Sequence, residues 1–493
     1  MLTDLLQQTI TKALPFSPTA QQAEAIGALS RFLLTPGAGA FVLRGYAGTG
    51  KTSVVGALVR ALQTLERPVV LLAPTGRAAK VMAARAGTTA YTIHKMIYRQ
   101  RTFQGEHTAF SLGYNKLRGA LFIVDEASMI GRGTSGISGG AQFGSGCLLD
   151  DLIRYVTEGA PGCRMLLVGD TAQLPPVGEA LSPALNRQEL EARGLNGVTG
   201  YDLTNVVRQA ETSGVLYNAT GLRQRLTAAT APATWPRIIA KGFADVCYLP
   251  GSELIETLEG SFHSAGREET IVITRSNKRA VVYNQGIRAR ILGRESELPA
   301  RGDLVMAVKN NYFWAEQEAT RRGADDRLPF DFIANGDVAL VEHLSNVHEM
   351  HGLRFADATL RFPDYDGCEL TCRVLLDTLW AEAPALTPAQ AEELYERVMA
   401  DYADIPSRRE RLKRLRQDPY YNALQIKYAY AVTCHKAQGG QWAHVYVDQG
   451  YPGEAPDEAY VRWLYTAITR CRERLYLVNW PMTQRQEGGE PVS

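Results

Sequence analysis

The segment Ala40-Phe-Val-Leu-Arg-Gly45-Tyr-Ala-Gly-Thr-Gly50-Lys51-Thr52 joins an apolar run to a glycine-rich turn that ends in lysine and threonine. Its second part fits the pattern G-x-x-x-x-G-K-[ST], and it lies between sequences typical of a strand and of a helix, which is the context this pattern requires. Glycines let backbone N–H groups curl around a phosphate, and the N-terminus of the following helix favours anions. The segment therefore predicts a nucleoside-phosphate site at the start of an α/β fold.

The loop residues have expected partners on such a ligand. Lys51 should reach the β- and γ-phosphates, and the hydroxyl of Thr52 should ligate Mg²⁺. Together with these two residues, the expected cofactor contacts are Gly45, Ala47, Gly48, Thr49 and Gly50. ATP and Mg²⁺ are the expected cofactors.

Further apolar runs have the form of buried parallel strands. With the first run they are Ala40–Leu43, Val69–Ala73, Leu121–Val124, Met165–Val168, Ile271–Thr274, Val445–Val447 and Leu475–Val478. Continuous Val/Ile/Leu runs, rather than alternating ones, are typical of sheets covered on both faces by helices. A long middle stretch separates the first four runs from the last three. We therefore expect an α/β protein with two parallel-sheet domains.

Two of these strands end in groups suited to phosphate hydrolysis. Asp125 and Glu126 directly follow the run at 121–124, and α/β sites form at the carboxyl ends of strands. Asp125 is expected to hold Mg²⁺, and Glu126 to orient or deprotonate the attacking water. Gln173 follows the run at 165–168 and could orient water beside the γ-phosphate. Without the neighbouring loop, the acidic pair would read as a solvated strand end and the Gln173 segment as a simple strand–turn.

Composition limits the alternatives. The chain has 493 residues, enough for about three or four domains, and 53 Lys plus Arg against 52 Asp plus Glu, so any nucleic-acid track must be a local groove. No apolar stretch approaches the ~20 residues that span a bilayer, and the N-terminus does not resemble a secretory signal. Seven cysteines without a C-x-x-C pair favour reduced thiols over a zinc site. We expect a cytoplasmic protein.

Residues 22–480 resemble the superfamily 1 helicases, in the 5′-to-3′ branch that includes RecD and Dda. Besides the segments above, the motifs that carry the resemblance, in the family's order, are Thr19-x-x-Gln22, Ala73-Pro-Thr75-Gly-Arg77-Ala-Ala-Lys80, Thr92-Ile-His94, Leu203-Thr-Asn-Val-Val-Arg208-Gln209, Asn335-Gly336-Asp337, Val432-Thr433-Cys-His435-Lys436-Ala-Gln438-Gly439 and Tyr465-Thr466-Ala-Ile-Thr469-Arg470.

The resemblance assigns a role to each motif. Gln22 would read adenine, and Arg208 and Arg470 would stabilise the charge of the transferring phosphoryl group. Contacts to nucleic acid are implied for Thr75, Arg77, His94, Thr433, His435 and Lys436. A single arginine of this kind can equally be a surface ion-pair residue, and His94 a structural histidine.

The resemblance also implies a division into two RecA-like motor domains with insertions. The first motor domain (1A) would comprise 1–97 and 118–200, with a small insertion (1B) at 98–117. The second (2A) would comprise 201–337 and 425–493, with an insertion (2B) at 338–424 that is β-barrel-like and ends in two helices. Two stretches depart from the family: the Gly/Ser-rich 131–146, expected to be a mobile loop, and 311–332.

The implied activity is that of an ATP-dependent DNA helicase, a monomer that moves 5′-to-3′ on single-stranded DNA and opens duplex junctions in repair, recombination or replication. Within 98–117, Phe103 or Phe110 could stack on the last base pair as a pin, and the alternative is that both rings anchor a hairpin. Two other functions stay open: an RNA-directed helicase of the same superfamily, and a nucleotide-switched DNA-binding module without processive unwinding.

Overall fold

The computed structural model describes residues 2–100, 108–133, 141–207, 212–227, 234–323, 328–330 and 332–486. Its N-terminal part is built on a parallel sheet with the strand order β3-β2-β6-β8-β1-β9. The strands are β1 (Ala40–Gly45), β2 (Val69–Ala73), β3 (Ala90–Thr92), β6 (Leu121–Val124), β8 (Arg164–Gly169) and β9 (Thr199–Leu203).

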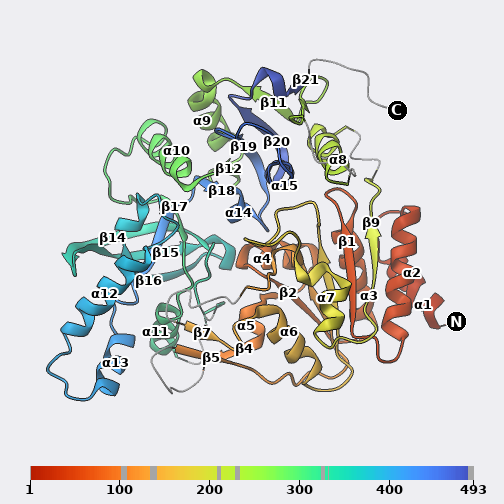
Figure 1. Cartoon of the computed structure of the whole chain (residues 1–493), viewed down its shortest axis with the longest axis horizontal. Helices are drawn as coiled ribbons and strands as arrows, with labels where there is room; N and C mark the ends of the chain where they lie inside the picture. The colour runs from red at the N-terminus through yellow and green to blue at the C-terminus, as the bar shows by residue number, and fades with distance from the viewer. Residues whose placement is uncertain are drawn as a thin grey trace.

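Helices cover both faces of this sheet because successive side chains of each strand point in opposite directions. In β1, Phe41 and Leu43 face the core formed with α1 (Leu2–Lys12), α2 (Ala20–Leu34) and α3 (Lys51–Thr64). Ala40 and Val42 face the other core. That second core is formed with α5 (Ile93–Ile97), α6 (Leu148–Thr157) and α7 (Arg187–Ala192). Figure 1 shows this arrangement, with α4 (Gly76–Ala86) above β2.

A second parallel sheet has the order β11-β20-β19-β12-β18. Its strands are β11 (Val246–Leu249), β12 (Thr270–Thr274), β18 (Ala431–Thr433), β19 (Trp442–Asp448) and β20 (Cys471–Val478). The helices around it are α8 (Gly214–Thr227), α9 (Leu254–Ser264), α10 (Asn277–Arg290), α14 (Cys434–Ala437) and α15 (Glu458–Ile468). A two-stranded parallel ribbon, β10 (Ile238–Ile239) with β21 (Arg485–Gln486), lies apart from both sheets.

The expected α/β architecture with two parallel-sheet cores is confirmed. All seven apolar runs named from the sequence lie in strands of these sheets, β1, β2, β6, β8, β12, β19 and β20. The strands that the apolar pattern missed are short or partly exposed. In β9, for example, only Leu203 is buried, so it carries no continuous apolar signal.

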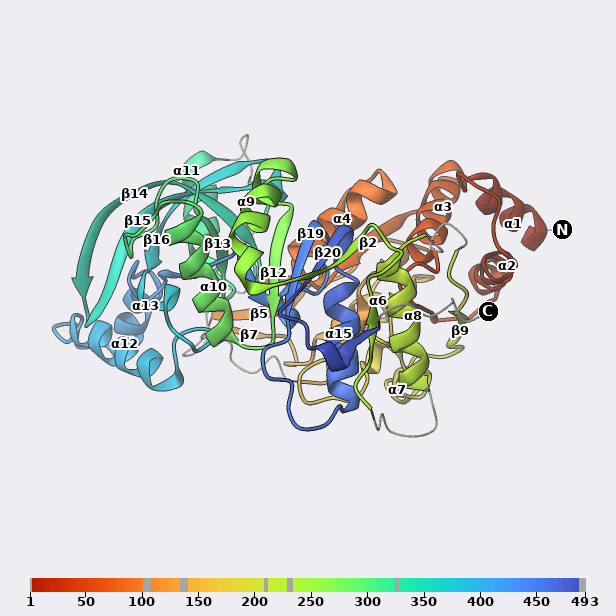
Figure 2. The same ribbon diagram turned by 90° about the horizontal axis from the view of Figure 1, so that it is seen from above.

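A closed five-stranded barrel, β13-β14-β15-β16-β17, lies at the opposite end of the molecule from α1 and α2 (Figure 2). Its strands are β13 (Leu304–Ala307), β14 (Val338–Met350), β15 (Leu353–Phe362), β16 (Cys368–Leu375) and β17 (Leu424–Tyr428). The barrel therefore takes in strands on both sides of the expected 338–424 insertion. Closure requires them, because β13 pairs with β14 on one side and with β17 on the other. Likewise β9 runs to Leu203, past the expected domain limit at 200.

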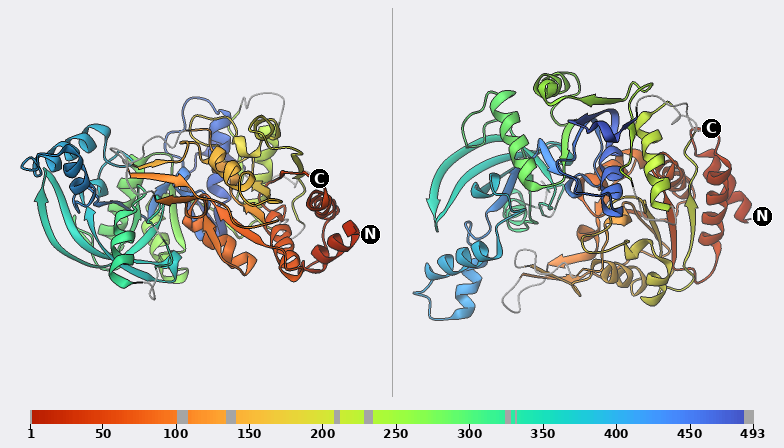
Figure 3. Two further views of the ribbon diagram at one scale, coloured as in Figure 1. Left: turned by 90° about the horizontal axis from the view of Figure 1, so that it is seen from below. Right: turned by 45° about the horizontal axis from the view of Figure 1, so that its top comes forward.

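Two helices extend from the barrel, α12 (Pro388–Ala400) and α13 (Arg408–Arg416), and Figure 3 shows them beside the β14–β16 strands. Both begin where the sequence places caps. Thr387 and Gln390 form a capping box on α12, and the Ser407 hydroxyl accepts a hydrogen bond from the Glu410 N–H. Leu412 and Leu415 are buried in a core cluster with Phe355 and Leu375 of the barrel strands. The basic run 408–416 therefore packs one apolar stripe against the barrel.

The 98–117 region contains a hairpin of β4 (Tyr98–Gln100) and β5 (Thr108–Leu112), and residues 101–107, including Phe103, lie outside the described residues. The Gly/Ser-rich stretch differs from the expected loop, because its residues Ala141–Phe143 form strand β7, which pairs in parallel with β5. The free edge of a hairpin strand offers unpaired N–H and C=O groups to such a segment. Residues 134–140 of the same stretch lie outside the described residues.

The 311–332 stretch contains α11 (Phe313–Arg322). It is anchored by Trp314, whose indole Nε1 donates a hydrogen bond to the Asn422 carbonyl at 2.9 Å. Among the described residues, no helix has both the length and the apolar character needed to cross a bilayer.

Candidate functional site

A cleft of about 740 Å³ runs between the two parallel-sheet units. Residues from the first unit that line it include the loop from Tyr46 to Thr52, together with Asp125, Glu126 and Gln173. From the second unit come Gly439, Gln441, Thr469 and Arg470. The cleft therefore gathers side chains from both ends of the sequence at the carboxyl ends of β1, β6 and β8.

The phosphate-binding loop is a tight backbone cradle. Gly48 (φ 77°) and Gly50 (φ 85°) are in the left-handed region, and α3 begins directly at Lys51. A Cβ on Gly50 would lie 2.3 Å from Gln22 Nε2, so only glycine fits there. The Lys51 ammonium donates hydrogen bonds to the Gly45 carbonyl at 2.6 Å and the Tyr46 carbonyl at 2.9 Å.

Gln22 supports this loop from behind. Its side chain is buried, its Nε2 donates to the Thr49 carbonyl at 3.1 Å, and its Oε1 accepts from the Thr19 N–H at 3.0 Å in the capping box of α2. The amide is thus bonded within the fold in this structure, and its adenine-reading role stays a prediction.

The acidic pair lies where β6 ends. The Asp125 N–H continues the strand pairing to the Leu72 carbonyl at 2.9 Å, and the Asp125 carboxylate accepts the Glu126 N–H at 2.9 Å. Glu126 itself is in the left-handed region (φ 52°). Burial in the cleft raises the pKa of both carboxyls, and for Asp125 the Lys51 ammonium opposes this shift.

Arg470 reaches the acidic pair from the second unit. Its side chain is 4% exposed, and its Nη1 lies 3.9 Å from Glu126 Oε1. The guanidinium is held by carbonyls of its own unit, with Nε donating to Thr466 at 3.1 Å and Nη1 to Gly440 at 3.4 Å. The positive charge of Arg470 counteracts the effect of burial on the pKa of Glu126.

Arg208 lies outside the described residues, but the chain just before it is placed. The Val207 N–H donates to the Gly48 carbonyl at 3.1 Å, so the segment that leads to Arg208 runs along the phosphate-binding loop.

Tyr465 joins the two units at the loop, a contact for which the sequence motif supplied no role. Its hydroxyl accepts the Ala47 N–H at 2.8 Å and donates to Asp170 Oδ2 at 2.6 Å. Thr466 adds a second connection by accepting the Leu174 N–H at 2.8 Å. The strand end after β8 is therefore tied to α15.

The residues of the cleft fit a magnesium nucleotide. The glycine cradle leaves no room for side chains, and the Thr52 hydroxyl and Asp125 carboxylate are the oxygen donors that Mg²⁺ prefers. The Gln173 amide oxygen is buried and accepts no hydrogen bond from the part of the chain that the structure describes. A buried acceptor without a partner is costly, so a donor on a ligand or water is expected there.

Candidate nucleic-acid residues lie on α4 and α14, at the seam between the units. Thr75 caps α4 by accepting the Ala78 N–H at 3.2 Å, and a Cβ on Gly439 would lie 3.2 Å from its hydroxyl. Arg77 stacks over the Trp442 ring at 4.1 Å. Arg77 therefore contacts the second unit in this structure.

The α14 residues form the other side of the seam. Thr433 precedes the helix without capping it, His435 is exposed, and the Lys436 ammonium donates to Asn335 Oδ1. Burial, with some contribution from Lys427, lowers the pKa of Lys436 to about 8.

His94 lies in α5 among aromatic rings. Its ring centroid is 5.6 Å from that of Tyr98 and 6.4 Å from that of Phe332, and burial lowers its pKa to about 4. It is therefore neutral at pH 7, which fits the structural reading. Phe110 lies in β5, where its backbone is in register with Gln100 and Phe143.

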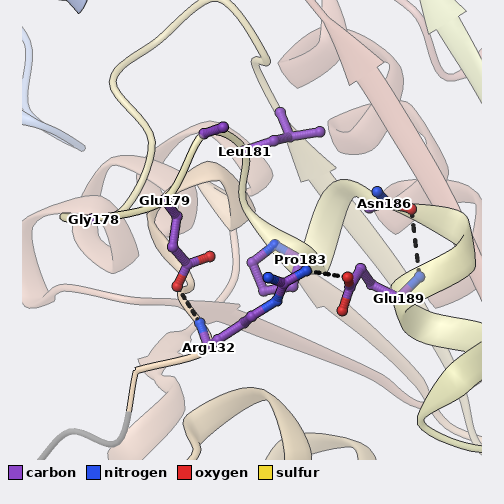
Figure 4. Close-up of a pocket in the computed structure, with 8 residues that line it drawn as sticks. Arg132, Gly178, Glu179, Leu181, Pro183, Asn186 and Glu189 are labelled. Atoms are coloured by element: carbon purple, nitrogen blue, oxygen red, sulfur yellow. Dashed lines mark hydrogen bonds and ion pairs between the residues drawn. The ribbon is translucent and has the colours of Figure 1, made fainter.

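A smaller pocket of about 260 Å³ lies outside the cleft (Figure 4). The backbone N–H of Arg132 donates to Glu179 at 2.5 Å, and its guanidinium donates to Glu189. Asn186 accepts the backbone N–H groups that open α7. Among the described residues that line this pocket, the one arginine is already bonded to Glu189, so none of them offers a free cation to a ligand.

Comparison with known proteins identifies both halves of the cleft. Residues 18–137 match the AAA domain family, and residues 428–478 match the UvrD-like helicase C-terminal domain family. The first match contains the phosphate-binding loop and the acidic pair. The second contains Arg470. Both matches therefore include residues that line the cleft.

Among curated proteins, the ATP-dependent RecD2 DNA helicase of Deinococcus radiodurans is 35% identical over 182 residues, covering 37% of this chain and 21% of the relative. The multifunctional conjugation protein TraI of Escherichia coli K12 is 24% identical over 485 residues, covering 88% of this chain and 26% of the relative. This chain thus spans only about a fifth to a quarter of either relative. Among solved structures, Pif1 helicase from Bacteroides in complex with ADP-AlF3 and ssDNA is 15% identical with a TM-score of 0.46, covering 96% of this chain and 95% of that one.

Proposed function

We propose that this chain, a RecD-like member of the superfamily 1 helicases, is an ATP-driven motor that translocates on single-stranded DNA and opens duplex junctions. The observation that carries the proposal is the contact between Arg470 Nη1 and Glu126 Oε1 at 3.9 Å. This contact joins the two sides of the cleft, one from each parallel-sheet unit. An arginine supplied by a second unit makes hydrolysis depend on how the units are arranged.

Each side chain then has a place in hydrolysis. Lys51 would hold the β- and γ-phosphates, and Thr52 with Asp125 would hold Mg²⁺, which would neutralise charge on the phosphates. Glu126 accepts a proton from the attacking water, which Gln173 helps to orient through its amide. Arg470 and Arg208 stabilise the negative charge that develops on the transferring phosphoryl group.

Glu126 is suited to the role of base. A raised pKa makes a carboxylate a stronger proton acceptor, and burial supplies that shift here. Arg470 limits the shift and keeps the ionised form accessible, which a base requires. The left-handed backbone at Glu126 is a further feature of functional sites, where strain is tolerated because the surrounding fold imposes it.

The strand is proposed to cross the seam between α4 and α14. Thr75, Arg77, Thr433, His435 and Lys436 would contact its backbone, and such contacts need no sequence preference. Coupling to the nucleotide is supported by the segment 439–442, which touches Thr75 and Arg77 and also contributes to the cleft. A change in the cleft would therefore alter the grip on the strand.

We assign the units as follows: the first parallel sheet and the second are the 1A and 2A motor domains, the β4–β5 hairpin is 1B, and the barrel with α12 and α13 is 2B. The protein would act as a monomer, since the residues proposed for hydrolysis all come from one chain.

The test is the ATP turnover rate without nucleic acid, with single-stranded DNA and with single-stranded RNA of the same sequence. We expect DNA to stimulate turnover several-fold and the Lys51→Ala variant to lose most turnover in all three conditions. Stimulation by RNA alone would assign the protein to RNA. Binding of DNA without any stimulation would instead favour a nucleotide-switched binding module.

A further inference from the structure

Arg85 links the metal-binding threonine to the second motor unit. It lies in the last turn of α4 and lines the cleft together with Thr52 and Gln441. Its Nη1 donates a hydrogen bond to the Thr52 hydroxyl oxygen at 3.3 Å. Its Nη2 donates to Gln441 Oε1 at 2.5 Å. One guanidinium therefore spans from the phosphate-binding loop to the segment that follows α14.

The Thr52 end of this bridge conflicts with metal binding. The oxygen that accepts from Arg85 is the same oxygen that is proposed to ligate Mg²⁺. Guanidinium groups only donate hydrogen bonds, and a unit positive charge at this distance repels a divalent cation. Arg85 and the metal thus compete for Thr52.

The Gln441 end of the bridge belongs to a segment that touches α4 at several points. Gly439 lies against Thr75, and Trp442 stacks under Arg77. The Gln441 carbonyl also accepts a hydrogen bond from Arg77 at 3.4 Å. Arg85 is the member of this set that contacts Thr52, so loss of that contact would alter the packing between α4 and the second unit.

We propose that Arg85 is a positioning residue that transmits the occupancy of the metal site to Gln441. When Thr52 is free, Arg85 bridges Thr52 and Gln441 and holds α4 to the second unit. Binding of the metal nucleotide displaces the guanidinium from Thr52 and loosens that bridge. This inference rests on the proposed function, because it takes Thr52 as the metal ligand.

The experiment measures the Mg²⁺ concentration that gives half-maximal binding of the fluorescent nucleotide mant-ADP to the full chain, without nucleic acid. Arg85→Gln removes the competing cation, so we expect half-saturation at a Mg²⁺ concentration lower by about threefold or more. Lys80→Gln is the matched control. It removes the same charge from the same helix, but Lys80 bonds the Pro363 carbonyl at 2.6 Å and pairs with Asp364, away from Thr52.

Gln441→Ala provides a second, independent variant. Without the hydrogen bond to Gln441, Arg85 is held less firmly at Thr52. The Mg²⁺ concentration at half-saturation should therefore also fall. The double variant should show less than the sum of the two effects, because both act through one bridge. Additive effects would overturn the link to Gln441.

The outcomes separate this inference from the proposed function. If the natural chain binds mant-ADP but Arg85→Gln leaves half-saturation unchanged, raises it, or shifts it no more than Lys80→Gln does, the inference is wrong and the proposed function stands. If the natural chain binds no mant-ADP at any Mg²⁺ concentration, both are wrong. Thermal melting of each variant confirms that it is folded.

Discussion

At the level of single residues, the fold holds Glu126 in a backbone conformation that is costly by itself. Glu126 is held in a left-handed backbone conformation that costs a non-glycine residue roughly 1–3 kcal/mol. The neighbouring Asp125 carboxylate accepts the Glu126 N–H and so helps to hold that turn. The Glu126 carboxylate lies 3.9 Å from Arg470, where the proposed mechanism needs a base and a charge-stabilising group together.

Replacement of these residues should separate nucleotide binding from hydrolysis. Glu126→Gln keeps the shape of the side chain but removes the base, so we expect ATP binding to persist while turnover falls by about 100-fold or more. Lys51→Ala should lose most turnover because the phosphates lose their positive partner. Mant-ATP binding and single-turnover hydrolysis measure the two steps. A Glu126→Gln variant with near-normal turnover would show that another group is the base.

At the level of elements, the turn before β14 connects the barrel to α4. Asp337 in this turn is buried, accepts the Ala334 N–H at 2.7 Å and receives hydrogen bonds from the Tyr365 hydroxyl at 3.1 and 3.2 Å. The first residue of α4 packs against this pair, since a Cβ on Gly76 would lie 2.4 Å from the Tyr365 hydroxyl. Burial raises the pKa of Asp337 to about 7.

The raised pKa of Asp337 predicts a pH-dependent cost. Below about pH 4 the carboxyl is protonated in both the folded and the unfolded chain, so it costs nothing. Above about pH 7 it is ionised in both, and its burial then lowers the free energy of unfolding by up to about 4 kcal/mol. We expect Asp337→Asn to raise the melting temperature at pH 8 and to lose this advantage as the pH falls from 7 to 4.

Asp357→Asn is the control for this prediction, because the Asp357 carboxylate is paired with Arg373 at 2.9 Å in the barrel. Its variant should gain no stability at pH 8. If Asp337→Asn melts lower than the natural chain at pH 8, the buried carboxylate is stabilising and the predicted sign is wrong.

The β4–β5 hairpin is the element proposed to split the duplex. Stacking of a base on an aromatic ring is worth about 1–3 kcal/mol, comparable to the ~1.4 kcal/mol of a base-pair step that must open. We expect Phe103→Ala or Phe110→Ala to abolish most unwinding and to leave DNA-stimulated ATP turnover nearly unchanged. Both activities are measured for each variant. A parallel loss of both would indicate that the ring anchors the hairpin, and unchanged unwinding in both variants would place the pin elsewhere.

At the scale of the whole molecule, the proposed motor has a direction. A strand that crosses both motor units in one orientation would be moved one way by each cycle of the cleft, and the proposed RecD-like kinship favours 5′-to-3′. We expect unwinding of a duplex with a 5′ single-stranded tail and none with a 3′ tail. A fluorescent strand-displacement assay with both substrates measures this. Preference for the 3′ tail would reverse the assigned direction and leave the ATPase proposal intact.

The sequence by itself determined the local parts of this protein. The loop at 45–52 and the seven apolar runs predicted two parallel-sheet cores, because buried strands and glycine turns depend on short-range chemistry. It did not predict β7, whose three residues become a strand only beside the edge of β5. It also missed that β13 and β17 belong to the barrel, because closure depends on pairing between distant segments.

Only the tertiary structure decided how the motifs meet. Tyr465 and Ala47 are 418 residues apart in sequence and share a hydrogen bond. Arg85 lies in no motif, and its bonds to Thr52 and Gln441 are visible only once α4 is packed against both units. Gln22, which its motif predicts to read adenine, donates a hydrogen bond to the Thr49 carbonyl of the phosphate-binding loop in this structure. Sequence patterns record which groups are present, whereas burial and long-range contacts determine which of them remain free to act.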